Sequence, residues 1–136
     1  MSVHTRHVVI GDSTVRLLVP SRREDKQVLA LSLIESQKAH CEAVFTKLFG
    51  GTAPESLPLI GNYRHDDGSV TREEIRVVEA TVSKSKLADQ AARAEVIGLA
   101  SDVCHQMDQE CVFVAWGAEG ILVSDQRPGR HAAIVR

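Results

Sequence analysis

Two stretches with the periodicity of an amphipathic helix alternate with stretches of β-strand pattern, and this alternation constrains the fold more than any other feature. Apolar residues recur at three- and four-residue steps over 23–49 and again over 85–108. Strand-like segments precede, separate and follow these two stretches. A chain of this kind is expected to fold as an α+β domain in which helices cover a sheet.

The first half of the chain predicts a hairpin followed by a helix. Strands over Val3–Ile10 and Thr14–Val19 would meet at a tight turn made by Gly11-Asp12. The segment Ser21-Arg22-Arg23-Glu24 matches a capping box, so the first helix is predicted to run from Arg23 to Phe49. Gly50-Gly51 would stop it, because glycine favours the conformation just past a helix end.

The second half predicts another hairpin, another helix and a final pair of strands. Ser83 or Ser85 would cap the second helix, which ends near residue 108. The predicted strands are Leu59–His65 and Val70–Val82, joined by a turn at Asp67-Gly68, then Cys111–Trp116 and Ile121–Val123.

Without the first strand, this order is β-α-β-β-α-β, the ferredoxin-like pattern, with an extra N-terminal strand. An antiparallel sheet would then carry two helices on one face, in a single α+β domain over residues 1–123. Residues 124–136 would form a flexible or edge-pairing tail. The other sheet face needs a cover, and the usual solution is a second copy of the chain, so a homodimer is expected.

Composition excludes several classes of protein. The 136 residues are 43% hydrophobic and 25% charged with a net charge of −2, which is typical of a globular chain and disfavours general nucleic-acid binding. The three cysteines show no metal-ligand spacing, so no metal site is predicted and the thiols are expected to be reduced. No apolar stretch is long enough for a signal peptide or a membrane span, so a cytoplasmic protein is expected. No cofactor is predicted.

Several short motifs in the middle of the chain resemble a group of small bacterial proteins of unknown function. The motifs are Phe49-Gly50-Gly51-Thr52, Gly61-Asn62-Tyr63-Arg64, Gly68-Ser69-Val70, Glu73-Glu74 and Gln109-Glu110-Cys111-Val112. They are similar to that group's run "FGG-T … GYW/GxW … DG-x-V-x-E … QE-x-V". This chain has Tyr63 at a position where an aromatic such as Trp is common in the group. The resemblance covers about residues 44–114. It implies a ferredoxin-like fold, and it implies no activity.

Four residues are candidates for a ligand-binding site. Tyr63, His65 and Glu73 belong to the second predicted hairpin, and Trp116 ends the strand that follows the second helix. His65 with neighbouring carboxylates could hold a divalent metal or poise a general base. The alternative is ordinary turn chemistry at Asp67-Gly68 and cross-strand charge pairing.

Trp116 has two interpretations as well. It could stack on a ligand, or it could be a packing anchor whose indole N–H needs one partner. Cys104 and His105 are adjacent on a predicted helix and point about 100° apart, so they are rejected as a catalytic dyad.

No catalytic set of residues is visible, which favours a non-catalytic dimeric binding module for a small molecule or a protein partner. One alternative is a small cofactor-free enzyme of the dimeric α/β-barrel type, with Tyr63 and His65 near its pocket. Another is an accessory protein of a mobile element.

Overall fold

The computed structural model describes residues 13–22, 27–53, 59–64 and 67–125. In this part the chain forms a five-stranded antiparallel sheet and three helices, which confirms the α+β class. In chain order the elements are β1 (Thr14–Val19), α1 (Leu31–Phe49), β2 (Leu59–Arg64), β3 (Val70–Thr81), α2 (Lys84–Leu87), α3 (Gln90–Gln106), β4 (Cys111–Trp116) and β5 (Glu119–Ser124).

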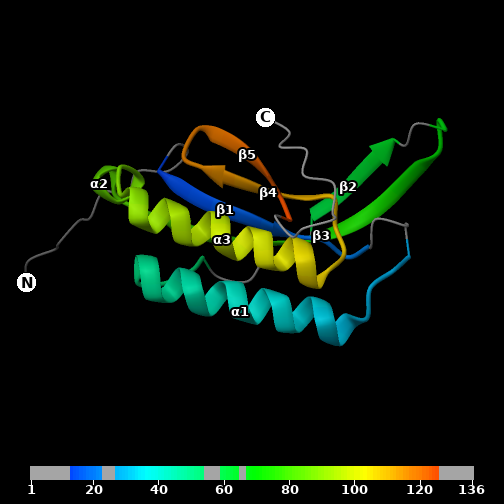
Figure 1. The fold of residues 1–136 in the computed structure, drawn as a ribbon, viewed down its shortest axis with the longest axis horizontal. Coiled ribbons are helices and arrows are strands. Elements are labelled where there is room, and N and C mark those ends of the chain that lie inside the picture. The colour runs from blue at the N-terminus through cyan, green and yellow to red at the C-terminus, as the bar shows by residue number, and fades with distance from the viewer. Residues whose placement is uncertain (1–12, 23–26, 54–58, 65–66, 126–136) are drawn as a thin grey trace, which may run out of the picture.

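The strands are arranged in the order β2-β3-β1-β4-β5, and every neighbouring pair is antiparallel. The long strand β3 has two partners along its length: its first half, Val70–Ile75, pairs with β2, and its second half, Arg76–Thr81, pairs with β1. The β2–β3 hairpin therefore extends beyond the end of β1 as a two-stranded ribbon (Figure 1). The predicted strand Val3–Ile10 lies outside the described residues.

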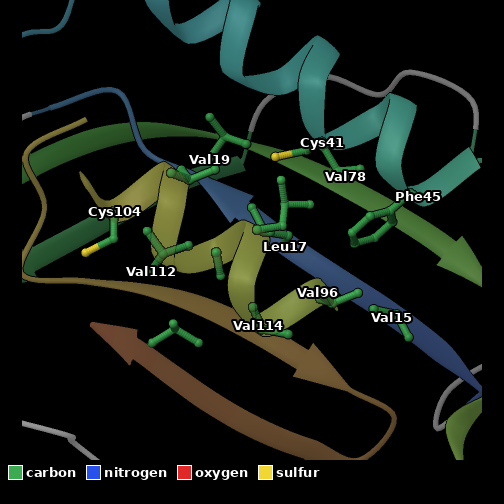
Figure 2. Close-up of a cluster of buried hydrophobic side chains, with 14 of the residues drawn as sticks. Val15, Leu17, Val19, Cys41, Phe45, Val78, Val96, Cys104, Val112 and Val114 are labelled. Atoms are coloured by element: carbon green, nitrogen blue, oxygen red, sulfur yellow. The ribbon is translucent and has the colours of Figure 1, made fainter. Parts of the chain in front are cut away.

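Both long helices cover the same face of the sheet, as predicted. Figure 1 shows α1 and α3 side by side on one side of the strands, and the two helices contact each other. The helix-facing side chains of β1, which are Val15, Leu17 and Val19, are fully buried. Cys41 and Phe45 of α1 are fully buried in the same cluster (Figure 2). Alternate residues of a strand point to opposite faces, so this core depends on the period-two pattern of β1.

Helix α1 begins at Leu31, and residues 27–30 are not helical, so the predicted continuous helix from Arg23 to Phe49 is wrong; Arg23 and Glu24 of the predicted capping box lie outside the described residues. The N-cap of α1 is Ala30, which makes no side-chain cap. Ser21 instead takes part in tertiary contacts, since its carbonyl accepts a hydrogen bond from the amide of Leu29 at 2.9 Å. Ser21 therefore lies ten residues before the first residue of α1, and its backbone bonds to Leu29 and not to the helix.

The predicted end of α1 is confirmed. Gly50 has φ of 85° in the left-handed region, and its N–H donates to the carbonyl of Thr46 at 2.8 Å. A side chain at this backbone conformation would be strained, which explains the glycine.

The second predicted helix is split into two. Ser83 caps the short helix α2, since its hydroxyl accepts from the amide of Lys86 at 3.2 Å. Asp89 then starts α3, and its carboxylate accepts from the amides of Ala91 and Ala92 at 3.0 and 3.1 Å. Asp89 is thus a second N-cap, six residues after Ser83, and it begins a new helix where the sequence predicted one continuous helix.

The end of the described chain belongs to the packed body. Ser124 is the last residue of β5, and Asp125 follows it; each side chain is 3% exposed. Residues 126–136 of the predicted tail lie outside the described residues. No helix in the described part of the chain is long and apolar enough to cross a membrane.

Candidate functional site

Glu73 of β3 has the most specific polar environment among the predicted site residues. Its Oε1 atom accepts hydrogen bonds from two consecutive backbone amides, Ser21 at 2.8 Å and Arg22 at 3.0 Å. Two adjacent N–H groups that converge on one carboxylate oxygen form a small anion-binding concavity. Among the described residues, no partner is found for the other oxygen, Oε2.

The two amides that bind Glu73 are themselves held in place. The Ser21 carbonyl accepts from Leu29, and Arg22 pairs with Val28 in an isolated β-bridge. The Nε of Arg22 also donates to the carbonyl of Arg72 at 3.3 Å. Ser21 and Arg22 are therefore held by residues 28 and 29 and by Arg72 of β3. The Glu73 carboxylate thus binds two amides whose positions are fixed.

The side of the sheet that carries Glu73 follows from the strand register. Val78 is the partner of Leu17, which is buried on the helix-covered face. Glu73 is five residues before Val78 on the same strand, and alternation therefore places it on the helix-free face. Arg76, three residues after Glu73, lies on the opposite face from Glu73. Its Nε atom is 3.7 Å from Oε1 of Glu35 in helix α1.

A second polar contact at the same end of the sheet joins α3 to β5. His105 Nδ1 lies 3.3 Å from Oδ2 of Asp125, whose side chain is buried. Cys104, its neighbour, donates through Sγ to the carbonyl of Gln109 at 3.1 Å. Cys104 and His105 therefore have different hydrogen-bond partners, Gln109 and Asp125. Sequence analysis considered His105 beside Cys104 and missed its contact with Asp125, because Asp125 is twenty residues further along the chain.

We call this region the polar end of the sheet. It is made by the ends of β1 and β5, by the chain between α3 and β4, and by the middle of β3. Its members are Ser21, Arg22, Glu73, His105, Gln109 and Asp125. The side-chain amide of Gln109 donates to the carbonyl of Arg22 and so ties the chain between α3 and β4 to the loop after β1.

Only part of the predicted hairpin site can be placed. Tyr63 is the backbone partner of Thr71, and Gly61, two residues earlier on β2, is the partner of Glu73. His65 lies outside the described residues. The turn after it behaves as ordinary turn chemistry requires: Asp67 Oδ1 accepts from the amide of Ser69 at 2.9 Å and from its hydroxyl at 2.6 Å. No group of three or more His, Cys, Asp or Glu side chains that could hold a metal ion is found within the described ranges.

Trp116 lies far from Glu73, so the four candidates do not converge on one pocket. Its register partner is Val15, near the start of β1, whereas Glu73 contacts the chain just after the end of β1. The separation along the strand is about 20 Å, and the two residues face opposite sides of the sheet. Trp116 is 5% exposed and donates through Nε1 to the Leu87 carbonyl at 2.9 Å, as a packing anchor does.

Comparison with known proteins identifies two solved structures of similar fold. The first is a phage SAM lyase in complex with S-methyl-5'-thioadenosine, with a TM-score of 0.57 and 18% identity over 92% of this chain and 98% of that chain. The second is a phage SAM lyase in the apo state, with a TM-score of 0.58 and 17% identity over 93% and 98%. No protein-family model matches this chain, and a search of curated proteins finds no match.

The comparison corrects the prediction of a non-catalytic binding module. The solved structures that share the fold are those of a lyase, and one of them holds a small molecule. The prediction was wrong because it relied on the absence of a familiar catalytic motif in the sequence.

Proposed function

We propose that this chain is a small enzyme that cleaves S-adenosylmethionine (SAM) as a lyase and releases S-methyl-5'-thioadenosine. The observation that carries this proposal is the similarity to the phage SAM lyase, which extends over nearly the whole length of both chains. At this low identity the similarity concerns the fold, so the residues that would act in this chain must be argued from its own geometry.

The reaction requires one bond to break, between the sulfonium sulfur and Cγ of the methionine part of SAM. The electron pair of that bond goes to sulfur, which becomes the neutral thioether of S-methyl-5'-thioadenosine. A lyase adds no water, so the remaining four-carbon fragment closes on itself or loses a proton. Attack by its own carboxylate on Cγ gives a cyclic lactone, and loss of a Cβ proton to a base gives an unsaturated amino acid.

Glu73 is the residue that we assign to substrate binding. One of its oxygens is fixed by the amides of Ser21 and Arg22, and the fixed carboxylate can present the other oxygen to a cation. SAM carries two positive groups, the sulfonium and the α-ammonium. Tyr63 on the adjacent strand β2 is a second candidate, because its backbone partner Thr71 is two residues from Glu73.

Electrostatics decide which cation Glu73 should bind. Sulfur loses its positive charge as the bond breaks, so a carboxylate beside it would stabilise the substrate more than the transition state and would slow the reaction. The ammonium keeps its charge throughout. A carboxylate that binds the ammonium therefore orients the substrate without this cost, and we assign Glu73 to that group.

The test is direct. Purified protein is incubated with SAM, and S-methyl-5'-thioadenosine is measured by liquid chromatography with mass spectrometry against a protein-free sample. S-adenosylhomocysteine, a neutral thioether that offers a poorer leaving group, serves as the control substrate and should not react. Mass spectrometry of the four-carbon product separates the lactone from the unsaturated acid. Formation of S-methyl-5'-thioadenosine no faster than in buffer would refute the proposal.

We also propose that the sheet is a ferredoxin-like sheet with one added strand. The order β2-β3-β1-β4 with α1 and α3 on one face supports this, and β5 is then the addition.

The homodimer expected from the sequence stays a prediction. The apolar side chains Ile75 and Val77 on the helix-free face are only partly buried, which supports a second copy as their cover. Light scattering during size-exclusion chromatography measures the mass that tests it.

A further inference from the structure

The turn after α3 fixes the backbone of Gln109 at both of its polar groups. Its N–H donates to the carbonyl of Cys104 at 2.9 Å, and its carbonyl accepts from the Cys104 thiol at 3.1 Å. Asp108 before it has φ of 51°, and its N–H lies 3.4 Å from the carbonyl of His105. These bonds are those of a Schellman motif, here with aspartate at the left-handed position that glycine usually occupies.

The side chain of Gln109 reaches across to the loop that follows β1. Its Nε2 atom donates to the carbonyl of Arg22 and also to the carbonyl of Met107 at 2.8 Å. Gln109 is 87 residues from Arg22 along the chain. The same short loop presents its amides to Glu73, so Gln109 and Glu73 bind opposite polar groups of one peptide segment.

We propose that Gln109 is a positioning residue for Glu73. It holds the carbonyl of Arg22, and this anchors the loop whose two preceding N–H groups, those of Ser21 and Arg22, point at one oxygen of the carboxylate. Without this anchor the loop can rotate its amides away, and Glu73 loses the orientation that presents its second oxygen. The effect on catalysis rests on the function proposed above, whereas the effect on the amides does not.

The chemistry of the contact explains why glutamine is required. A carbonyl such as that of Arg22 needs a donor, and the primary amide of glutamine can also bind the Met107 carbonyl at the same time. Methionine has a similar length and shape but no donor. The substitution Gln109→Met therefore removes the hydrogen bonds with little change in volume.

The experiment compares Gln109→Met with a matched control, Gln106→Met, which changes an exposed glutamine three residues earlier. Backbone amide shifts of Ser21 and Arg22 are measured by two-dimensional NMR of the labelled full chain. Hydrogen bonding to a carboxylate moves such protons downfield, so Gln109→Met should move both upfield by a few tenths of a ppm. Gln106→Met should leave them unchanged, and Glu73→Gln should shift them in the wild-type background but add little in the Gln109→Met background.

Kinetics with SAM give the second readout. Gln109→Met is expected to raise KM about tenfold with little change in kcat, because the affected carboxylate binds substrate. Added to Glu73→Gln, it should cause no further loss, since both changes act through the same contact. If Gln109→Met unfolds below the assay temperature, Gln109→Glu replaces it: glutamate keeps the shape and places an acceptor against the Arg22 carbonyl.

The outcomes separate the two proposals. Unchanged amide shifts in the folded Gln109 variant would overturn the positioning role, whatever the activity. Shifts that move as expected in a protein that forms no S-methyl-5'-thioadenosine would leave the positioning role intact and refute the lyase function. A fall in kcat at constant KM would contradict the assignment of Gln109 to substrate positioning through Glu73.

Discussion

The carboxylate of Glu73 lies 2.8 Å from the backbone nitrogen of Ser21, although 52 residues separate them in the chain. This contact joins the first half of β3 to the loop after β1 at the polar end of the sheet. It uses one carboxylate oxygen, and it lies on the helix-free face.

Replacement of Glu73 by glutamine should reduce kcat/KM for SAM cleavage on the order of 100-fold while the protein stays folded. Glutamine keeps a carbonyl oxygen for the two amides but has no charge for the substrate ammonium. The matched control is Glu74→Gln, because Glu74 lies on the other face and is 3.7 Å from Arg76. The control should stay within about twofold of wild type. Equal losses in both variants would argue against a specific role for Glu73.

Replacement of Trp116 by phenylalanine should lower stability by about 1–3 kcal/mol. The change removes the indole donor of the Leu87 carbonyl and leaves space beside Phe49, whose ring centroid lies 6.2 Å from that of Trp116. Urea unfolding followed by circular dichroism measures the difference. Phe113→Leu, at a side chain that is 38% exposed, is the control and should cost clearly less. A stable Trp116→Phe protein would show that the anchor is dispensable.

Asp89 should make wild-type stability depend on acid pH. Its pKa is lowered from 3.8 chiefly by the hydrogen bond from the amide of Ala92, with help from the charge of Lys86. A carboxyl whose pKa is lower in the folded state stabilises it above the unfolded-state pKa, and this stabilisation is lost as pH falls through the folded-state value. Wild type should therefore melt slightly above Asp89→Asn at pH 7, because the charge of aspartate interacts favourably with the N-terminus of α3.

The same pair of proteins provides the check. Their melting temperatures, measured by calorimetry from pH 7 downwards, should converge below pH 3.8, where the aspartate becomes protonated. A difference that is constant with pH would mean that the charge of Asp89 contributes nothing and that its oxygen alone caps α3.

The thiol of Cys41 should be inert in the folded protein. Burial, with a smaller effect from the charge of Glu42, raises its pKa to about 12, so almost no thiolate exists at pH 8. Burial also raises the pKa of the half-buried Cys111. Ellman's reagent should therefore label the native protein slowly and the guanidinium-unfolded protein at once. Rapid native labelling of one thiol, located by peptide mass mapping, would identify a reactive cysteine.

The local patterns of the chain determined most of its secondary structure. The alternation in Thr14–Val19 predicted β1 at its observed bounds, and Gly50 predicted the end of α1. Both signals act over a few residues, since strand alternation and left-handed glycine need no distant partner. The grouping of both long helices on one face also followed, because the predicted order β-α-β-β-α-β is typical of a sheet with two helices on one face.

Tertiary structure decided the start of α1, the position of each site residue and the polar end of the sheet. Ser21 has the residue type of a helix cap, but its backbone is engaged by Leu29 and Glu73, and that competition is invisible in a local pattern. The same holds for Gln109 with Arg22 and for His105 with Asp125. Such contacts depend on strand order and register, which arise from the packing of the whole chain and not from any one segment of it.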